Sequence, residues 1–174
     1  MAPLRILVAG VGNPLRGDDA AGPMAIERLQ ARMPQASCPG VEYMVSGGET
    51  GELLGRLEAC DAAILIDACV SGAEAGTIHE FDVAAGPLPQ RLGGFSSHGF
   101  GVHEALELAR ALGQLPARCR VLAIDAQRDT HGAPVSAAVE AAVDAVVDRV
   151  RRQLQCWCTR PVTQPGVSGG SRGP

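Results

Sequence analysis

Short aliphatic segments alternate with longer amphipathic segments along this chain, and this alternation limits its fold more than any other feature of the sequence. Five short segments are rich in β-branched or aliphatic residues and are predicted strands: 4–8, 41–45, 63–66, 77–81 and 121–124. Four longer segments space their apolar residues three and four apart, as helices that face a core do: 22–33, 51–59, 102–112 and 136–154. The pattern predicts an α/β protein.

The order of these segments also predicts how the strands pair. A strand that returns through a helix pairs in parallel with its neighbour by a right-handed crossover, which places helices on both faces of the sheet. Only the short link 71–76 precedes segment 77–81, so this strand is expected to return antiparallel. We therefore expect a twisted, mixed, five-stranded sheet in a three-layer α/β/α sandwich.

The length of the chain allows one domain of ordinary size. Its 174 residues include only 3% aromatic residues, so the core must be built from Val, Leu, Ile and Ala. We expect a single domain over residues 1–155 and a flexible C-terminal tail over residues 156–174, because the end of the chain is rich in Gly, Pro and Ser and has few apolar side chains to bury.

Charge and cysteine placement restrict the partners and the compartment. The net charge of -4 and the pI near 5.5 argue against a nucleic-acid partner. No segment has the roughly 20 consecutive apolar residues of a membrane span, and no signal peptide precedes the first strand, so we expect no membrane association. Cys60, Cys69 and Cys119 lie in or beside apolar segments and are interpreted as buried, reduced thiols, which favours the cytoplasm.

The loop after the first strand, residues 10–19, contains three glycines and ends in two adjacent carboxylates, Asp18 and Asp19. It is not a dinucleotide fingerprint, because Leu15 stands where the third glycine should be and no acidic residue ends the second strand. Two carboxylates would repel a phosphate and attract a cation. The alternative is that Asp18 or Asp19 only caps the following helix.

Two further residues lie where ligands gather in open α/β sheets. Asp67 directly follows the apolar segment 63–66 and is expected at the carboxyl edge of the sheet, although it could instead bind loop amides. His98 directly follows the long loop 84–97 and lies between Ser97 and Gly99 in the sequence. Imidazole is a common ligand of transition metals. The alternative for His98 is a surface residue at the start of a helix.

These three places are predicted to converge on one rim of the sheet and to supply two carboxylates and one imidazole, an incomplete metal shell with open positions. Weaker histidine candidates are His79, His103 and His131, which we interpret as structural or exposed. The segment 156–158 (Cys-Trp-Cys) has no second Cys or His pair nearby to complete a zinc shell and is interpreted as a surface feature at the end of a helix.

The same residues resemble the maturation endopeptidases of [NiFe] hydrogenases. The resemblance covers roughly residues 4–154 and is carried by three motifs in order: Gly10-x-Gly12-Asn13-x-Leu15-x-x-Asp18-Asp19-x-x-Gly22, then Ile66-Asp67-Ala68, then Ser97-His98-Gly99. It implies a twisted mixed sheet between helices, with Asp19, Asp67 and His98 as the metal-contacting and catalytic residues.

The resemblance further implies a metal-dependent or aspartic-type endopeptidase that recognises nickel already inserted in the precursor of a hydrogenase large subunit and then removes a C-terminal peptide. Nickel would belong to the substrate. No Ser-His-Asp, Cys-His or zinc-protease arrangement is present, so one carboxylate is expected to activate water. The leading alternative is a nickel chaperone or scaffold without enzymatic activity, and a nucleotide-binding oxidoreductase comes third.

Two segments depart from the pattern of that family. Many members carry Asp-Gly-Gly-Thr after the second strand, where this chain has Ser46-Gly47-Gly48-Glu49, and the Pro-Glu pair found after the last strand is Ala126-Gln127 here. Both departures predict a difference in which hydrogenase is processed, and neither changes the three expected ligands.

Overall fold

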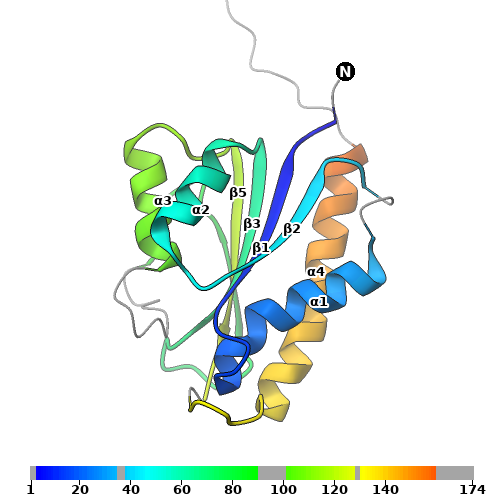
Figure 1. The fold of residues 1–174 in the computed structure, drawn as a ribbon, viewed down its shortest axis with the longest axis vertical. Helices are drawn as coiled ribbons and strands as arrows, with labels where there is room; N and C mark the ends of the chain where they lie inside the picture. The colour runs from blue at the N-terminus through cyan, green and yellow to red at the C-terminus, as the bar shows by residue number, and fades with distance from the viewer. Residues whose placement is uncertain (1–2, 35–37, 90–100, 128–129, 160–174) are drawn as a thin grey trace, which may run out of the picture.

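The computed structural model describes residues 3–34, 38–89, 101–127 and 130–159. Within these ranges the chain forms one sheet flanked by helices (Figure 1). The elements in chain order are β1 (Ile6–Val11), the short 3-10 helix η1 (Gly17–Ala20), α1 (Ala21–Arg32), β2 (Val41–Ser46), α2 (Thr50–Glu58), β3 (Ala62–Cys69), β4 (Ile78–Asp82), α3 (Val102–Ala111), β5 (Arg118–Asp125) and α4 (Ala137–Thr159).

The sheet is mixed, as the connection lengths predict. Its strands lie in the order β2-β1-β3-β5-β4, and all neighbouring pairs are parallel except β4 and β5. The short link before β4 leaves no room for a crossover helix, so β4 returns antiparallel along the edge of β5. The predicted five-stranded α/β fold is confirmed.

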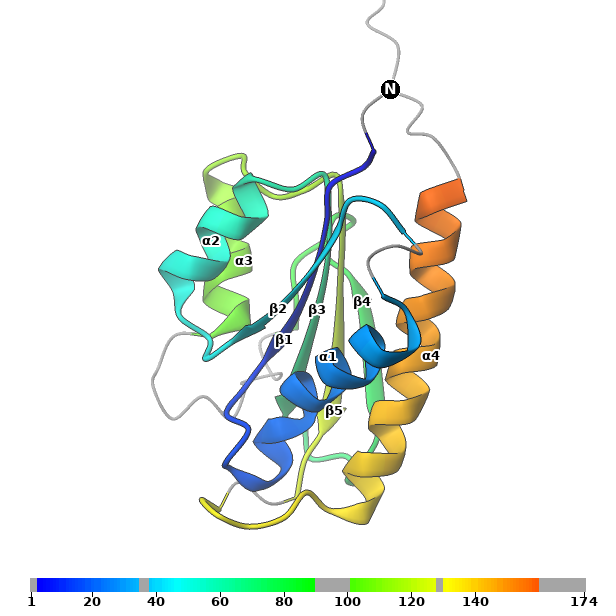
Figure 2. The same ribbon diagram turned by 45° about the vertical axis from the view of Figure 1, so that its right-hand side comes forward.

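The helices form the two outer layers of the sandwich. Figures 1 and 2 show α1 and α4 on one face of the sheet and α2 and α3 on the other. In β1, Ile6 and Val8 pack with the α1/α4 layer, while Leu7 and Ala9 pack with the α2/α3 layer. Both faces of the central strands are covered, which explains why β1 is apolar throughout and β3 is apolar from Ala62 to Ile66. No helix in the described ranges combines the length and apolar character that a membrane crossing requires.

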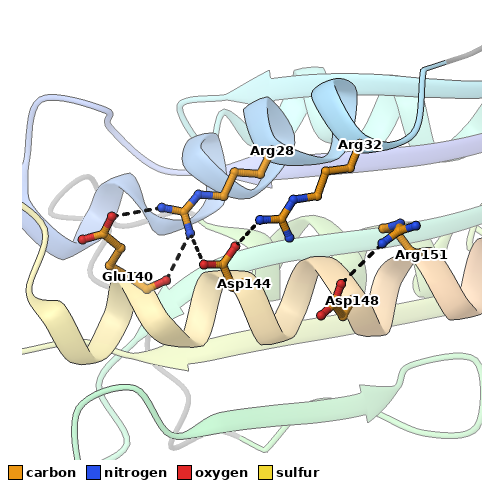
Figure 3. Close-up of polar contacts among 6 residues, drawn as sticks. All are labelled: Arg28, Arg32, Glu140, Asp144, Asp148 and Arg151. Atoms are coloured by element: carbon orange, nitrogen blue, oxygen red, sulfur yellow. Dashed lines mark hydrogen bonds and ion pairs between the residues drawn. The ribbon is translucent and has the colours of Figure 1, made fainter.

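Ion pairs join the two helices of the α1/α4 layer (Figure 3). Arg28 of α1 lies 3.1 Å from a carboxylate oxygen of Glu140 and 3.0 Å from one of Asp144. Arg32 lies 2.7 Å from the other carboxylate oxygen of Asp144. Asp144 therefore holds two arginines of α1 at once, whereas Asp148 pairs only with Arg151 of its own helix, at 3.6 Å.

The third strand is longer than predicted, and this changes the place of Asp67. The expectation that Asp67 directly follows the strand is wrong, because β3 continues to Cys69. The ladder with β5 pairs Ala68 with Ile124 and Cys69 with Asp125. The end of β3 is therefore paired with β5 like its apolar centre. Hydrophobicity alone marked only the apolar centre of the strand.

The last helix is also longer than predicted. It continues to Thr159, through the expected boundary between domain and tail at residues 155 and 156. Trp157 is buried in the α1/α4 core, and Cys158 forms a disulfide with Cys38 across a Cα–Cα distance of 6.4 Å. The interpretation of segment 156–158 as a surface feature is therefore wrong for Trp157, whereas Cys156 and the disulfide-bonded Cys158 are exposed. The predicted tail over residues 160–174 lies outside the described residues.

The three cysteines expected to be reduced are unpaired. Cys69 and Cys119 are buried, and Cys60 is half-buried. Burial raises the pKa of the Cys60 thiol to about 11 and that of the Cys119 thiol to about 12. Both thiols are therefore protonated and unreactive at neutral pH.

Candidate functional site

Glycines of the first motif bring α1 into contact with the sheet. A Cβ atom on Gly10 would lie 2.2 Å from the carbonyl oxygen of Gly22. A Cβ atom on Gly22 would lie 2.3 Å from the carbonyl oxygen of Val11 and 2.7 Å from that of Ile66. Backbone atoms cannot move aside as a flexible side chain can, so only glycine fits at these positions. The close packing places the start of α1 beside the ends of β1 and β3.

The same motif positions Asp19. Gly12 has φ +137°, and a Cβ atom there would lie 2.0 Å from the carbonyl oxygen of Asp19, so the loop folds directly against η1. The N–H of Asn13 donates to Oδ2 of Asp19 at 2.8 Å, and Oδ1 of Asn13 accepts from the N–H of Leu15 at 2.9 Å. Asp19 is half-buried, and its carboxylate is thus fixed at the carboxyl edge of the sheet.

Asp18, its neighbour in sequence, has a different role. It is fully buried, and its carboxylate accepts from the N–H of Ser136 at 2.6 Å, the hydroxyl of Ser136 at 3.0 Å and the N–H of Gln127 at 2.7 Å. Ser136 directly precedes α4. The alternative that Asp18 or Asp19 caps the following helix is wrong, because α1 has no side-chain cap, and Asp18 instead holds the start of α4.

The third carboxylate, Asp67, lies close to Asp19. Burial and the negative charge of Asp19 together raise the pKa of Asp67 to about 8, although a hydrogen bond from the N–H of Ala68 at 2.8 Å favours its ionised form. Two carboxyl groups from segments far apart in sequence therefore meet at the edge of β3. A neighbouring pair of this kind shares a proton in the absence of a cation and offers oxygen ligands when a cation is present.

The third expected ligand, His98, lies outside the described residues. The described chain resumes at Gly101, whose N–H donates to Oε2 of Glu104 at 2.7 Å and so fixes the first turn of α3. The helix α3 lies on the same face of the sheet as the side chain of Asp67, because Asp67 has the same parity in β3 as Ala63 and Leu65 of the α2/α3 core. The role of His98 stays a prediction.

A second polar group, which the sequence analysis did not assemble, lies farther along the same face. The buried carboxylate of Asp125 accepts from the N–H of Ser71 at 2.8 Å and from its hydroxyl at 2.7 Å, and it lies 2.5 Å from Nε2 of His79. The thiol of Cys69 is within reach of the same carboxylate. Burial alone would raise the pKa of Asp125, but the hydrogen bonds from Ser71 and His79 outweigh it and keep this pKa below its usual value.

The sequence signal for this group was that Asp67 and Cys69 lie two residues apart in one strand, together with an aspartate at the end of β5. The apolar pattern did not reveal this signal, because it predicted that the third strand ends before Cys69. Of the other two histidines, His103 is half-buried in α3 and His131 is exposed in a turn, as expected.

The loop after β2, where the sequence departs from the Asp-Gly-Gly-Thr pattern, is ordered by a serine. The hydroxyl of Ser46 donates to Oε2 of Glu52 at 2.8 Å and accepts from the N–H of Gly48 at 3.2 Å. Gly48 has φ +90°, which favours glycine. Ser46 thus connects the end of β2 to the first turn of α2, beside the loop that contains Asp19.

Comparison with protein families identifies a match over most of the chain. A family model described as hydrogenase maturation protease matches residues 23–153, a range that includes Asp67 and His98 and begins after Asp19. The Hydrogenase 2 maturation protease of Escherichia coli (strain K12) is 32% identical over 126 residues, which are 70% of this chain and 73% of that protein. A hydrogenase expression/formation protein HupD from Thiocapsa roseopersicina is 34% identical over 113 residues, 64% of this chain but only about half (49%) of that relative.

Solved structures of similar proteins have the same fold. The solution structure of an endopeptidase from Escherichia coli superposes with a TM-score of 0.72 at 28% identity and covers 87% of this chain and 93% of that one. The crystal structure of a [NiFe] hydrogenase maturation protease HycI from Thermococcus kodakarensis KOD1 superposes with a TM-score of 0.68 at 20% identity, over 88% of this chain and 94% of that one. The second similarity supports the fold alone.

Proposed function

This chain belongs to the hydrogenase maturation protease family, and from this premise we propose that it recognises nickel in the precursor of a [NiFe] hydrogenase large subunit and removes the C-terminal extension of that precursor. Membership of the family makes the protein a peptidase, and therefore a hydrolase. The observation that carries the finer proposal is the proximity of the carboxyl groups of Asp19 and Asp67 at one edge of the sheet.

The chemistry of this pair suits a divalent cation that arrives with the substrate. Asp19 comes from the loop after β1 and Asp67 from β3, and each carboxylate accepts a hydrogen bond from a nearby backbone N–H. His98 is the proposed nitrogen ligand. Two carboxylates and one imidazole bind a borderline divalent ion such as nickel and leave further positions for ligands from the precursor and for water.

The two carboxyl groups differ in protonation before a cation binds. Because the pKa of Asp67 is about 8, this residue holds a proton at neutral pH when only Asp19 faces it. A cation bound by both groups favours their ionised forms, so Asp67 releases its proton. One of the two carboxylates then accepts a proton from a water molecule while the oxygen of that water attacks the scissile carbonyl carbon. The carboxyl group passes this proton to the departing amine.

The first experiment compares nickel-loaded and nickel-free precursor. Each is incubated with the protein, and the loss of the C-terminal peptide is followed by mass spectrometry. We expect cleavage of the nickel-loaded precursor only. Equal cleavage of both forms would contradict the recognition of nickel, and a stable complex with unchanged precursor mass would favour the alternative of a chaperone or scaffold.

Substitutions in the proposed site test the individual residues. Asp19→Asn, Asp67→Asn and His98→Ala should each lower the cleavage rate by about 100-fold or more, the usual effect of removing an acid–base group or ligand. Asp61→Asn is the matched control, since Asp61 precedes the opposite end of β3 and pairs with Arg5 at the surface. Normal processing by His98→Ala, with the fold intact by circular dichroism, would remove His98 from the mechanism.

A further inference from the structure

The side chains of Cys69, His79 and Asp125 come from three adjacent strands and meet at one point on the α2/α3 face of the sheet. Cys69, the last residue of β3, lies opposite Asp125, the last residue of β5. His79 of β4 lies opposite Ala123, two residues before Asp125, and so faces the same side. These three strands are neighbours in the sheet, in the order β3-β5-β4. The sheet itself therefore holds all three side chains.

The distances within this group are short enough for one ion. One ligand atom from each residue, the Sγ of Cys69, a ring nitrogen of His79 and a carboxylate oxygen of Asp125, lies within 4.8 Å of the other two. Donor atoms around a tetrahedral zinc ion lie roughly 3–4 Å apart, because each is about 2.0–2.3 Å from the metal. Small rotations of the side chains would bring the group to this geometry.

The donor types are those of a borderline transition metal. A thiolate, an imidazole and a carboxylate are the ligand set of zinc and of the ions that replace it, such as cobalt, whereas calcium and magnesium prefer oxygen ligands alone. We propose that Cys69, His79 and Asp125 bind one divalent transition-metal ion of the zinc class, with a fourth position open to water. None of the residues proposed to meet the nickel of the substrate belongs to this site.

The surroundings of the group match those of metal sites in two ways. Ser71 donates both its N–H and its hydroxyl to the Asp125 carboxylate, and such outer hydrogen bonds orient ligands around a metal. The side chain of Asp125 is only 2% exposed while that of His79 is 26% exposed, so an ion can enter past the imidazole and is otherwise enclosed. The bound ion would hold the ends of β3, β4 and β5 together beside Asp67.

The competing interpretation is a hydrogen-bonded group that binds no metal. The contact of His79 with Asp125 already compensates the buried carboxylate, and an ion must replace that contact and take the proton of the Cys69 thiol. The two interpretations differ in one observable property. A metal site places a thiolate on the ion, and a hydrogen-bonded group does not.

The test is a titration of the chelator-treated full-length protein, with its Cys38–Cys158 disulfide intact, with Co²⁺, followed by absorbance. We expect about one equivalent to produce a thiolate-to-cobalt charge-transfer band together with the visible bands of tetrahedral cobalt, and Zn²⁺ to abolish both. Cobalt bound by Asp19, Asp67 and His98 has no sulfur ligand and gives no such band. The result is therefore independent of whether the protein cleaves a precursor.

Variants assign the band to these residues. Cys69→Ser should remove it, His79→Gln should weaken cobalt binding by at least about 10-fold, and Ser71→Ala should weaken it by roughly 10-fold through the loss of the hydroxyl hydrogen bond to Asp125. The control is Cys119→Ser, which changes another buried thiol on the same face and should keep the band. No thiolate band in folded wild-type protein, or an unchanged band in Cys69→Ser, would overturn the proposal. The wild-type titration decides even if a variant fails to fold.

Discussion

The two faces of the sheet differ in their side chains near the carboxyl ends of the strands. On the α1/α4 face, β3 presents Ala62, Ile64, Ile66 and Ala68, all buried and apolar to the carboxyl end. On the α2/α3 face, the same strand changes after Leu65 to ionisable side chains, in the order Asp67 and Cys69. One strand thus serves two purposes, and the alternation of its side chains keeps them apart.

The arrangement of the helices follows the same division. The α1/α4 layer is held to the sheet by glycine contacts, to itself by the ion pairs of Figure 3, and to the loop with Asp18 by hydrogen bonds. The α2/α3 layer covers an apolar core only over the first part of β3 and β5, and beyond it lie the Asp19–Asp67 pair and the group of Cys69, His79 and Asp125. We propose that the α1/α4 face mainly stabilises the fold and that the α2/α3 face holds the two proposed sites.

The largest effect of a change in packing is expected where a side chain is added between the α1/α4 layer and the sheet. In Gly22→Ala the new methyl group would lie 2.3 and 2.6 Å from backbone atoms of Val11, so α1 must move away from the sheet. We expect a loss of about 3 kcal/mol in the free energy of unfolding, measured by urea denaturation. A loss below about 1 kcal/mol would show that this contact is not tight.

The control for this prediction lies in the opposite layer. Gly55 is inside α2 and has no atom within 4 Å of an added Cβ, and its φ is not in the positive range. Gly55→Ala should therefore raise the free energy of unfolding by up to about 1 kcal/mol, since alanine has the higher helix propensity. Opposite signs for the two substitutions would confirm that the layers tolerate added volume differently.

The apolar pattern and the lengths of the connections were sufficient to predict the five strands, the antiparallel return of β4 and the four α-helices, because burial on both faces leaves aliphatic runs in the central strands. It was insufficient at strand ends. Cys69 and Asp125 continue the ladder although they are not part of an aliphatic run, and the strand boundaries were therefore placed too early. Backbone hydrogen bonding, which every residue type can share, extends a strand beyond its apolar segment.

The site was predictable to a different degree. A loop with two carboxylates beside glycines indicated Asp19, and an aspartate after an apolar run indicated Asp67, but nothing local separates Asp18 from Asp19. Their roles differ because Asp18 contacts Ser136, more than 100 residues away. The disulfide between Cys38 and Cys158 was missed for the same reason, since it spans 120 residues and depends on how α4 lies against β2.

The pH dependence of the free energy of unfolding tests the raised pKa of Asp67 on the α2/α3 face. The pKa of Asp67 is about 8 in the folded protein against 3.8 for the free group, so the folded protein holds a proton that the unfolded chain releases. This group should lower stability as pH rises from about 4 to about 8, with a slope of at most about 1.4 kcal/mol per pH unit. Asp67→Asn mimics the protonated form and should remove that slope.

The measurement is urea unfolding of the metal-free protein at pH 5 and pH 8. Asp67→Asn should be more stable than the wild type at both pH values, and by the larger margin at pH 8. Asp61→Asn is the control, because the pKa of Asp61 is lowered by Arg5 and this substitution should not stabilise the protein at pH 8. Equal stability of Asp67→Asn and wild type at pH 8 would show that Asp19 and Asp67 do not interact in the folded protein.

The smallest effect is expected from the surface ion pairs that distinguish the α1/α4 layer. Asp144→Asn removes the contacts with both Arg28 and Arg32 and should lower the free energy of unfolding by about 1 kcal/mol, less at high salt because these charges are partly exposed. Asp148→Asn removes a single contact within α4 and should lower it by only about 0.3 kcal/mol. If urea denaturation gave equal losses for the two variants, the pairs between α1 and α4 would add nothing beyond ordinary helix-surface contacts, and the rigidity of this face would rest on glycine packing and Asp18 alone.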